Sequence, residues 1–576
     1  MGAHYTPPAL AHLLADKIVE HLEPSSAREI RVLDPACGDG GLLHAAIDAL
    51  RQRGFDNCHA VGVEADPKAL AEAGRAFEKA EDGLVELMAG DFLELAAGFE
   101  PQRDLWSSHA TTGRLCGDFD VVIANPPYVR TQVLGAARAQ QLANRFGLSG
   151  RLDLYHAFIR AITHSLRRGG VLGIITSNRF MSTLAGKAIR AFLSDNLEVL
   201  ELIDLGDTKL FEAAVLPAVL VGRRPGGRRS PDPYLVPFTR VYAQAHGIAS
   251  GGDVTPDRGS IVEAVAAGDE GLVQVPGGRF AITRGKFPLS PGASHVWALL
   301  SPHESNLVER LRERSHRTIE EVAHVRVGIK TTADDVFIRE DWTGLPAERS
   351  PEVELLRPLL RHEDAHRWAM PRRHAPSARV LYPHFVVGGA KRVVDLEHYP
   401  RSRAYLEDFR SRLAARRYVI EAGRNWYEVW VPQDPAAWAS PKIVFPDISP
   451  DPRFCLVEDN CLVNGDCYWM TLRPGVAEEI LYLILGVANS GLMTRFHDAA
   501  FSNRLYSGRR RYITQYVGKY PLPDESTHIA RRIGSLAREM VKAARTGAAD
   551  QVRQLEETMD SLVYEAFGLD RNGGLL

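Results

Sequence analysis

The stretch Phe119-Asp120-Val121-Val122-Ile123-Ala124-Asn125-Pro126-Pro127-Tyr128 decides the fold that this sequence predicts. Its first six residues form an apolar run rich in β-branched side chains, which is typical of a buried strand in a parallel sheet. The last four residues then fall at the carboxyl end of that strand, where open α/β sheets bind their ligands. Two consecutive prolines have fixed φ angles and no N–H, so the turn is stiff and its carbonyls face outward. We therefore expect chemistry at this turn.

The turn suits an exocyclic aromatic amine, whose nitrogen is a poor nucleophile because its lone pair is delocalised into the ring. The side-chain oxygen of Asn125 and the carbonyl of Pro126 can each accept one N–H, which makes the nitrogen more tetrahedral and more nucleophilic. Tyr128 would stack on the ring. An ordinary Pro-Pro turn with a surface tyrosine has the same four residues, so the surrounding motifs have to separate the two interpretations.

A glycine-rich turn lies near the N-terminus of the chain. Asp34-Pro35-Ala36-Cys37-Gly38-Asp39-Gly40-Gly41-Leu42 follows a short strand at 31–33 and precedes a helical pattern at 43–50. Strand, turn and helix form the opening unit of a nucleotide-binding sheet, in which small residues let a ligand approach the backbone. Leu43 stands where the dinucleotide fingerprint requires glycine, so this pattern disfavours a dinucleotide.

Acidic residues end the next two predicted strands. Glu64 follows the strand at 60–63 and is placed to accept both hydroxyls of a ribose. Asp91 follows the strand at 84–88 and can accept from the amino group of an adenine, while Phe92 covers the face of that base. A solvated loop acid is the alternative for each one alone. Together with Asp34, they predict one site at the ends of three successive strands.

Further segments complete the first domain. Tyr5-Thr6-Pro7-Pro8 predicts a helix start with Thr6 as N-cap and Pro7 at the first helical position. Such a helix end favours an anionic group, although capping alone also explains the pattern. A fifth strand at 171–176 ends before Phe180, and strand-like runs at 199–205 and 215–222 bring the sheet to roughly seven strands.

With these residues in place, the chain resembles the N6-adenine DNA methyltransferases of restriction–modification systems, in the amino-first or gamma group of TaqI-type enzymes. The resemblance covers the order of motifs over roughly the first 225 residues. It implies a class I S-adenosylmethionine-dependent methyltransferase fold, α/β with a Rossmann-like seven-stranded sheet, and a C-terminal α+β target-recognition domain. The implied cofactor is S-adenosylmethionine, held by Tyr5, Thr6, Asp34, Ala36, Gly38, Glu64, Asp91, Phe92 and Asn125.

The resemblance also implies a mechanism and a substrate. Asn125, Pro126 and Tyr128 would form the catalytic motif, and the methyl group would pass directly to the amino nitrogen of an adenine rotated out of duplex DNA. The sulfonium of the cofactor is already a leaving group, so we expect no metal. Two departures stand out. Asp39 replaces the usual serine, and 181–187 holds no aromatic to clamp the base, so Phe180 is the expected substitute.

The second half of the chain shifts towards arginine and aromatic residues. Between Arg361 and Arg424 there are 14 Lys or Arg and 7 Asp or Glu, while the whole chain has a formal net charge of −3. A second segment, 504–519, is basic, contains no acid and is interleaved with tyrosines. Such local excess favours nucleic-acid binding, with a solvated arginine-rich face as the alternative. The expected DNA contacts are Arg416, Arg417, Arg509, Arg510 and Arg511.

Length and composition bound the organisation of the protein. The 576 residues, 45% of them hydrophobic, suit several large cores, and the six cysteines form no Cys-x-x-Cys pair. We expect a catalytic domain at 1–225, a connecting region at 226–300, a DNA target-recognition domain at 301–525 and a helical tail at 526–576. The expected protein is a cytoplasmic, nucleoid-associated bacterial monomer without a membrane segment or fused nuclease, and a separate restriction endonuclease as partner stays open.

Other functions fit parts of the pattern. Methyltransferases of ribosomal RNA and of the glutamine in release factors also use Asn-Pro-Pro-Tyr-like turns, but they tend to be smaller, and the basic second half favours long nucleic acid. A non-catalytic DNA-binding subunit would not need Asn125 or Asp34. A nicotinamide oxidoreductase is a third alternative. The sequence therefore predicts site-specific adenine methylation of duplex DNA.

Overall fold

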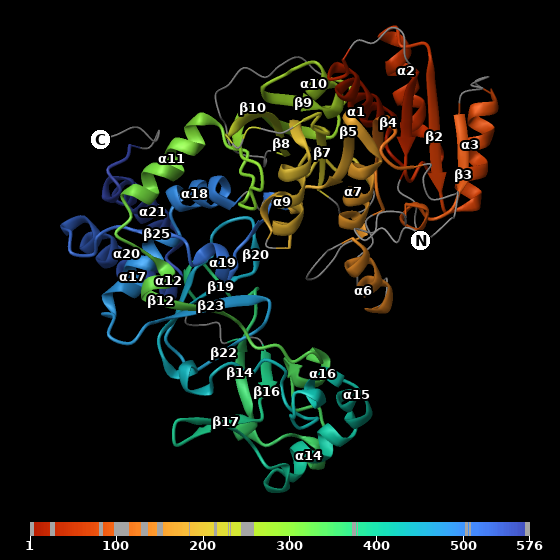
Figure 1. Ribbon diagram of the computed structural model, residues 1–576. Coiled ribbons are helices and arrows are strands. Elements are labelled where there is room, and N and C mark those ends of the chain that lie inside the picture. Colours follow the sequence, from red (N-terminus) through yellow and green to blue (C-terminus); the bar gives the residue numbers. More distant parts are fainter. Residues whose placement is uncertain are drawn as a thin grey trace. The chain divides into compact units, whose positions relative to one another are not determined.

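The computed structural model describes residues 5–23, 29–79, 85–96, 115–127, 136–146, 154–183, 185–211, 216–227, 230, 232–243, 258–370, 376, 378–501, 505 and 508–570. The chain divides into two compact units, and Figure 1 labels the elements of each. The first unit comprises Met1–Pro302 with Leu505–Gly508, and the second His303–Arg504 with Arg509–Leu576.

One ten-stranded sheet forms the centre of the first unit, in the order β3-β2-β1-β4-β5-β7-β6-β8-β10-β9. Strands β1 to β5 pair in parallel, and β7 runs antiparallel between β5 and β6. The carboxyl ends of β1 to β5 therefore meet at one edge. The strands are β1 (Ile30–Asp34), β2 (Cys58–Glu64), β3 (Val85–Ala89), β4 (Phe119–Ala124), β5 (Leu166–Ser177), β6 (Glu198–Asp204), β7 (Pro217–Arg223), β8 (Tyr234–Ala243), β9 (Gly271–Val275) and β10 (Gly278–Leu289).

Strand β4 shows why its sequence is apolar apart from Asp120, whose Oδ2 accepts from the backbone N–H of Arg31 at 2.9 Å. Its six residues are all buried, and successive side chains point to opposite faces of the sheet. Val121 and Ile123 belong to the core that includes α1 and α2, whereas Val122 and Ala124 belong to the core that includes α7. Both faces of the sheet are therefore covered, as a doubly wound fold requires.

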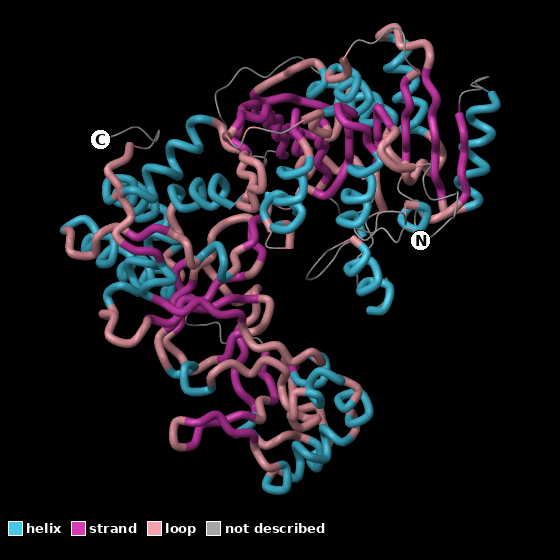
Figure 2. Tube along the Cα trace, viewed as in Figure 1, coloured by secondary structure: helices cyan, strands magenta, loops and turns pink. Residues whose placement is uncertain are grey.

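Helices of the first unit lie on both sides of this sheet (Figure 2). They are α1 (Pro8–Glu20), α2 (Gly41–Gln52), α3 (Pro67–Lys79), α4 (Phe92–Leu95), α6 (Ala136–Arg145), α7 (Leu154–Ser165), α8 (Arg179–Ser182), α9 (Lys187–Asn196) and α10 (Ile261–Ala266). Helix α1 begins one residue later than the sequence predicts, because Pro7 is the N-cap residue and Pro8 the first helical one. Thr6 does not cap this helix, and its hydroxyl is used elsewhere.

The region 226–300, which the sequence predicts as a connection, extends the sheet instead. Strand β8 pairs in parallel with β6, and β10 pairs antiparallel with both β8 and β9. The sheet thus has three strands more than the expected seven, and the first unit continues to Pro302 rather than ending near residue 225. Strand β8 is buried on both faces, with Val236 and Phe238 in one core and Val241 in the other, which explains why it joins the sheet.

The second unit combines helices with small, mostly antiparallel sheets. A five-stranded sheet has the order β12-β23-β19-β21-β15 and a four-stranded sheet the order β13-β16-β14-β22, with two-stranded ribbons β11-β25, β17-β18 and β20-β24. The strands are β11 (Arg317–Thr318), β12 (Ala323–Val327), β13 (Ile338–Arg339), β14 (Leu356–Leu360), β15 (Trp368–Ala369), β16 (Ala378–Leu381), β17 (His384–Val387), β18 (Ala390–Val393), β19 (Lys442–Pro446), β20 (Ile448–Ser449), β21 (Cys455–Val457), β22 (Leu462–Val463), β23 (Cys467–Leu472), β24 (Arg510–Arg511) and β25 (Pro521–Leu522).

The helices of the second unit include the last described residues of the chain. They are α11 (Pro302–Glu313), α12 (Ile319–Val322), α13 (Asp334–Phe337), α14 (Pro400–Glu407), α15 (Arg410–Ala414), α16 (Arg417–Glu421), α17 (Glu479–Ala488), α18 (Gly491–Phe501), α19 (Thr514–Val517), α20 (His528–Thr546) and α21 (Ala549–Ala566), with 3-10 turns η1 (Ala347–Arg349), η2 (Val353–Leu355), η3 (Leu396–His398) and η4 (Pro435–Ala439).

The C-terminal helices are part of the second unit rather than a separate tail. Helix α20 packs against α17, α21 and β15. The indole N–H of Trp368 on β15 donates to Glu556 of α21 at 2.9 Å. Among the described helices, none has both the length and the apolar character that a membrane crossing needs.

Candidate active site

Asp34 and Asn125 mark the centre of the candidate site. Asp34 is the last residue of β1, and Asn125 directly follows β4. The two strands are parallel neighbours in the sheet, and Leu33 pairs with Val122. Asp34 is fully buried, and its Oδ1 accepts from the backbone N–H of Ala36 at 3.1 Å. Its Oδ2 has no hydrogen-bond partner among the described residues. A buried carboxylate oxygen without a donor is uncommon in native proteins, so it points to a ligand.

The Asp34 carboxyl also has a strongly altered acidity. Burial raises its pKa to about 7, and the nearby charges of Glu64 and Asp39 act in the same direction. The hydrogen bond from Ala36 lowers the pKa but offsets only part of this. A cationic or donor group placed against Oδ2 would therefore favour the ionised form of Asp34.

The glycine-rich turn is connected to the end of β2 through Glu64. One oxygen of Glu64 accepts from the backbone N–H of Gly38 at 2.9 Å, and the other accepts from Asp66 at 2.8 Å. Gly38 has a φ of +55°, in the region that favours glycine. Glu64, which the sequence predicts at the same site as the glycine-rich turn, therefore contacts that turn directly. Ala36 lies in the same turn.

Gly40 needs to be glycine for two reasons. Its φ is +88°, and a Cβ at this position would lie 2.7 Å from Cε2 of Phe77 on α3. Phe77 itself stacks on His44 of α2, with ring centroids 4.1 Å apart. The turn, α2 and α3 therefore pack too closely for any larger residue here.

Tyr5 and Thr6 reach the site from the N-terminal segment. The Tyr5 ring approaches to 3.4 Å of the position that a Cβ on Gly38 would take, and its hydroxyl donates to Glu72 at 3.4 Å. Its side chain is 46% exposed, so one face of the ring is available to a ligand. The Asn125 Nδ2 donates to the Thr6 hydroxyl at 3.1 Å, which fixes the orientation of the Asn125 amide.

The structure describes the two prolines that follow Asn125 in the catalytic motif. Pro126 is buried and Pro127 is half-buried at the end of β4. Tyr128 lies outside the described residues. The described part of the motif therefore comprises the amide of Asn125 and the stiff Pro-Pro turn behind it.

Asp91 and Phe92 lie at the end of β3 but differ in availability. One oxygen of Asp91 caps α4 by accepting from Leu93 at 2.9 Å, and the other accepts from Arg138 at 3.1 Å. Phe92 is only 1% exposed and stacks on Phe158, with centroids 5.8 Å apart. The expectation that the Phe92 ring covers a base is wrong for this structure, because the ring is buried in the core.

Phe180 is also a core residue rather than a base clamp. It is fully buried and makes an edge contact with Trp297, with ring centroids 5.6 Å apart. Arg190 donates to the carbonyl of Phe180 at 2.6 Å and holds this segment in place. Trp297 follows β10, far away in the sequence, so no local pattern indicates that Phe180 is covered.

A second buried acid near the same edge was not predicted. Asp204 ends β6 and accepts from Asn178 at 3.0 Å, from Gly206 at 3.0 Å and from the Tyr242 hydroxyl at 2.9 Å. Burial raises its pKa, as it does for Asp34. Because both oxygens of Asp204 have donors, this cluster braces strands β5, β6 and β8, whereas Asp34 keeps an oxygen for a ligand.

The predicted DNA-binding arginines lie in the second unit, and most have partners inside the protein. Arg416 is buried, and it donates to the carbonyls of Leu413, Thr331, Trp426 and Glu428. Arg510 forms a two-pronged ion pair with Asp498, at 2.6 and 2.8 Å, and Arg511 forms a similar pair with Asp447 at 3.1 and 3.2 Å. The expectation of phosphate contacts is thus wrong for Arg416 and not favoured for Arg510 or Arg511.

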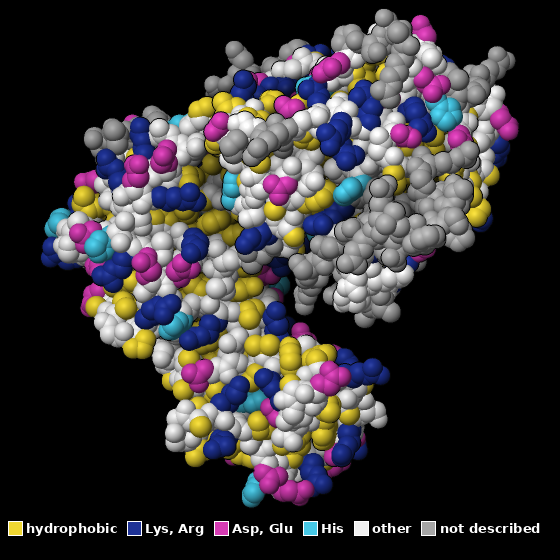
Figure 3. Space-filling view, in the orientation of Figure 1, with side chains coloured by type: hydrophobic (Ala, Val, Ile, Leu, Met, Phe, Trp, Pro, Cys, Tyr) yellow, Lys and Arg dark blue, Asp and Glu magenta, His cyan; other side chains and the backbone are white. Residues whose placement is uncertain are grey.

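Arg417 and Arg509 keep exposed side chains without an ion pair to any described residue. Tyr512 and Tyr516, from the basic segment 504–519, are buried around His497 and do not offer stacking faces. Figure 3 shows basic and acidic side chains interspersed on the visible face, rather than one continuous basic field. The local charge excess in the sequence is therefore largely balanced by acids that fold against it.

The evenly spaced cysteines have a structural explanation. Cys455, Cys461 and Cys467 are buried free thiols in the core of the second unit, and burial raises the pKa of each. Two surface groups with metal-ligand atoms, His316 with Asp524 and Glu525 and His362 with Glu363 and Asp466, also lie in this unit. Neither group includes a residue of the first unit, whose strand ends carry the candidate site.

Comparisons with known proteins agree on one class. Residues 72–211 match the Eco57I restriction-modification methylase family. The type II methyltransferase M.BanIII of Aneurinibacillus aneurinilyticus is 38% identical over 99% of this chain and 97% of its own length. The type II methyltransferase M.PaeR7I of Pseudomonas aeruginosa is 26% identical over 91% of this chain and 86% of its own length.

A solved structure resembles the fold along most of the chain. The ATP-dependent type ISP restriction-modification enzyme LlaBIII, bound to DNA, covers 94% of this chain and 39% of its own, with a TM-score of 0.50 and 10% identity. At that identity, the likeness concerns the fold alone.

Proposed function

Since this chain belongs to the type II DNA methyltransferases of restriction–modification systems, we propose that it transfers the methyl group of S-adenosylmethionine to the amino nitrogen of an adenine in duplex DNA. One observation carries the assignment to an amino nitrogen, and the resemblance of the motif order to adenine methyltransferases is the reason for choosing adenine. The Asn125 amide follows β4, next to the buried Asp34 of β1, and is oriented by the hydroxyl of Thr6. An oriented amide beside a stiff Pro-Pro turn suits an amine target, because an amine offers two N–H donors.

The residues around the glycine-rich turn fit the cofactor. The unpartnered Oδ2 of Asp34 suits the cationic amino group of the methionine part, which would also keep the carboxyl ionised. Glu64 already accepts two backbone N–H groups, but each carboxylate oxygen can accept more than one donor, so ribose hydroxyls can still bind. The half-exposed ring of Tyr5 beside Gly38 suits contact with the same ligand.

Asp91 is the proposed acceptor for the adenine of the cofactor. Its two oxygens accept from Leu93 and Arg138, and the side chain is 43% exposed in its pair with Arg138. The exposed carboxylate keeps acceptor capacity for an amino group. Phe92 is not included in this proposal, because its ring is buried.

The chemical step depends on positioning. When bound, S-adenosylmethionine supplies a methyl group on a sulfonium, which needs no metal for activation. The Asn125 oxygen and the Pro126 carbonyl would accept the two N–H groups of the target and turn the nitrogen lone pair towards the methyl carbon. Held in this way, the target nitrogen would take the methyl group as the carbon–sulfur bond breaks, the sulfur would leave as a neutral thioether, and the nitrogen would release one proton to water. The adenine has to leave the base stack to reach this turn.

The test is transfer of a labelled methyl group to duplex DNA, followed by digestion and identification of the modified nucleoside. We expect N6-methyladenine from the native protein. Label on cytosine, on RNA or on protein would overturn the adenine assignment, and cofactor binding without any transfer would favour a non-catalytic subunit.

Three variants test the assigned geometry in the same assay. Asn125→Ala should abolish transfer while cofactor affinity stays nearly unchanged, because the amide acts on the target amine. Thr6→Val should lower kcat by about tenfold, the loss expected when one orienting hydrogen bond is removed. Thr6→Ser keeps the hydroxyl and should retain most of the activity. Full activity of Asn125→Ala would contradict the proposed role.

A further inference from the structure

The ribbon β17-β18 in the second unit is an isolated hairpin. Among the described strands, β17 and β18 pair only with each other, and Gly388 and Gly389 form the turn with φ values of +56° and +78°. Phe385 and Val387 are 41% and 56% exposed. Figure 1 shows the hairpin projecting from the neighbouring strands of its unit. Phe385 and Val387 are two residues apart on one strand, so their exposed side chains share one face of the ribbon and can contact a partner together.

The charges of this hairpin distinguish it from the nearby arginine-rich segments. It contains no Asp or Glu from 384 to 393, and the exposed Lys391 and Arg392 form no ion pair with a described residue. Arg401, Arg403, Arg410 and Arg412, in contrast, lie within 4 Å of the carboxylates of Glu352, Glu397, Glu407 and Asp335 respectively. The hairpin therefore presents net positive charge that the fold does not neutralise.

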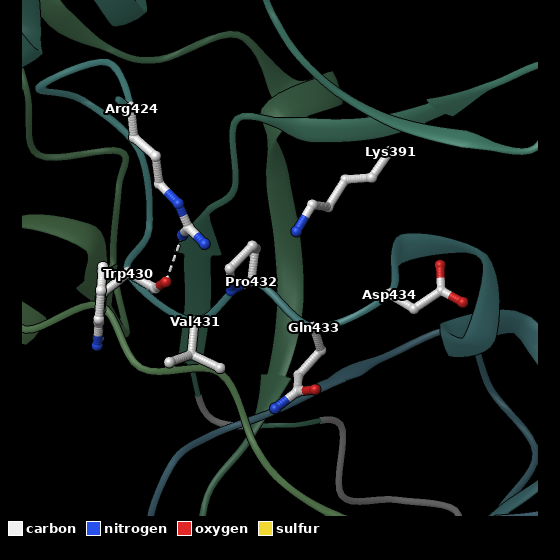
Figure 4. A pocket seen from close by; sticks show the side chains of 7 residues that line it. All are labelled: Lys391, Arg424, Trp430, Val431, Pro432, Gln433 and Asp434. Carbon is white, nitrogen blue, oxygen red and sulfur yellow. Dashed lines mark hydrogen bonds between the residues drawn. The ribbon is translucent and has the colours of Figure 1, made fainter. Parts of the chain in front are cut away.

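A pocket of about 500 Å³ adjoins the hairpin through Lys391. Its other lining residues are Arg424, Trp430, Val431, Pro432, Gln433 and Asp434. Figure 4 shows the cationic ends of Lys391 and Arg424 approaching Pro432 from opposite sides. The one acid of the lining, Asp434, accepts from the backbone N–H of Ala436 at 3.0 Å and so caps η4.

Aromatic side chains continue the surface beyond the pocket. The guanidinium carbon of Arg424 lies 5.2 Å from the ring centroid of Trp430. The rings of Trp430 and Tyr418 meet edge to face, with their centroids 4.9 Å apart. Tyr418 is 41% exposed and follows the exposed Arg417 on α16. Glu421, also exposed on α16, is the acid at this end. Cations interleaved with aromatic faces are a feature of nucleic-acid surfaces.

We infer that the hairpin β17-β18, the pocket beside Lys391 and the pair Tyr418–Trp430, together called the hairpin surface, contact duplex DNA, with the ribbon entering a groove. This inference rests on the proposed function. A two-stranded ribbon fits the major groove, the apolar Phe385 and Val387 suit contact with base edges, and the exposed Lys391 and Arg392 suit phosphates. The hairpin surface thus replaces the buried Arg416 and the ion-paired Arg510 and Arg511 as the expected contact.

The test measures binding of a fluorescently labelled duplex of mixed sequence to the full-length protein over a range of salt concentrations. Lys391→Ala with Arg392→Ala is compared with Arg403→Ala with Arg412→Ala, which removes two ion-paired arginines and the same total charge. For the hairpin pair, we expect about tenfold weaker binding and a salt slope lower by about 1 to 2. The control pair should change affinity by less than about twofold. Unchanged melting temperatures would show that both proteins are folded.

A third variant separates groove contact from general attraction. Phe385→Ala removes no charge, so it should leave the salt slope unchanged but alter which sites are methylated, as read by sequencing the modified base. Native salt dependence in the Lys391 and Arg392 variant, or a changed oligomeric state instead of changed DNA affinity, would overturn the inference. Methylation of DNA by that variant at the native rate would leave the proposed function intact. Absence of both DNA binding and methylation in the native protein would refute the proposed function itself.

Discussion

Two buried aspartates of the first unit show how hydrogen-bond partners decide the role of a residue. Asp34 and Asp204 both end strands of the same sheet, and burial raises the pKa of both. Asp204 has donors on both oxygens, from Asn178, Gly206 and Tyr242, and it holds strands together. Asp34 has a donor on one oxygen only, among the residues that the structure describes. A buried acceptor without a donor is costly unless a ligand satisfies it, so Asp34 is the residue prepared for binding.

The pKa of Asp34 predicts how stability depends on pH in the absence of the cofactor. The folded protein keeps the Asp34 proton up to about pH 7, whereas the unfolded chain releases it near the ordinary value of 3.8. The free energy of unfolding should therefore fall as the pH rises from about 4 to 7, by about 2 to 4 kcal/mol from this group. Denaturant unfolding of the native protein and of Asp34→Asn at several pH values measures the difference.

The Asp34→Asn variant should lose that part of the pH dependence, because its amide does not titrate. Saturating cofactor should reduce the slope in the native protein, since a cation against Asp34 stabilises the ionised form. Parallel pH profiles of the two proteins, without the cofactor, would show that Asp34 does not titrate in this window.

Among the elements, the glycine-rich turn is defined by contacts from its neighbours in space. Gly40 combines a φ of +88° with close packing, since a Cβ there would lie 2.7 Å from the Phe77 ring of α3. Gly54 has a similar φ of +82°, but a Cβ on it would meet no heavy atom within 4 Å beyond its chain neighbours among the described residues. The two glycines therefore share the backbone requirement and differ in packing, a difference that the sequence does not show.

These two glycines form a matched pair for mutation. Gly54→Ala should lower the free energy of unfolding by about 1 kcal/mol through backbone strain alone. Gly40→Ala adds the clash with Phe77 and should lower it by about 2 to 4 kcal/mol, with weaker cofactor binding because the turn shifts. Chemical unfolding and cofactor titration measure the two effects. Equal losses of stability would mean that α3 moves away without cost.

The basic segments show a related effect between elements. Arg510 on β24 lies twelve residues from its partner Asp498 on α18, and Arg511 pairs with Asp447, which follows β19. The segment 504–519 contains no acid, and its partners come from other parts of the fold. Charge counted along the sequence therefore overestimates the charge that the folded surface presents.

Across the full chain, each unit is completed by a segment that the sequence predicts as a connection or a tail. The second unit is completed by α20 and α21, which pack on α17 and β15 and contribute Glu556 as acceptor for Trp368. The first unit is completed by β8, β9 and β10, whose buried side chains join the two cores of the sheet. Neither segment is a linker or a tail.

Removal of residues 526–576 should therefore damage the second unit rather than trim it. Loss of α20 exposes the buried faces of α17 and β15, whose side chains include Leu481, Ile484 and Trp368. We expect a protein with low solubility and a second unit that limited proteolysis digests rapidly, because the apolar surface that α20 covers would be exposed to water. A soluble, protease-resistant product with native DNA affinity would show that the two helices are dispensable.

Local patterns in the sequence were enough to predict strands β1 to β7 of the sheet in the first unit, and the order of the motifs predicted the class of enzyme. The apolar run 119–124, the glycine-rich turn and the acids that end successive strands are such patterns, because strand burial and turn geometry depend on neighbouring residues. They placed Asp34, Glu64 and Asn125 correctly at strand ends, and the match to M.BanIII confirms a type II methyltransferase. Adenine as the target stays a proposal.

Which side chains remain available for ligands could be known only from tertiary contacts. Trp297 covers Phe180, Phe158 covers Phe92, and backbone carbonyls surround Arg416, so three predicted ligand contacts belong to the core. In the opposite direction, Thr6 is not a helix cap and instead holds Asn125. Whether a side chain is free to bind a ligand depends in some cases on a partner about a hundred residues away in the sequence. Hydrogen bonds and burial between such partners leave no periodic signal in the sequence.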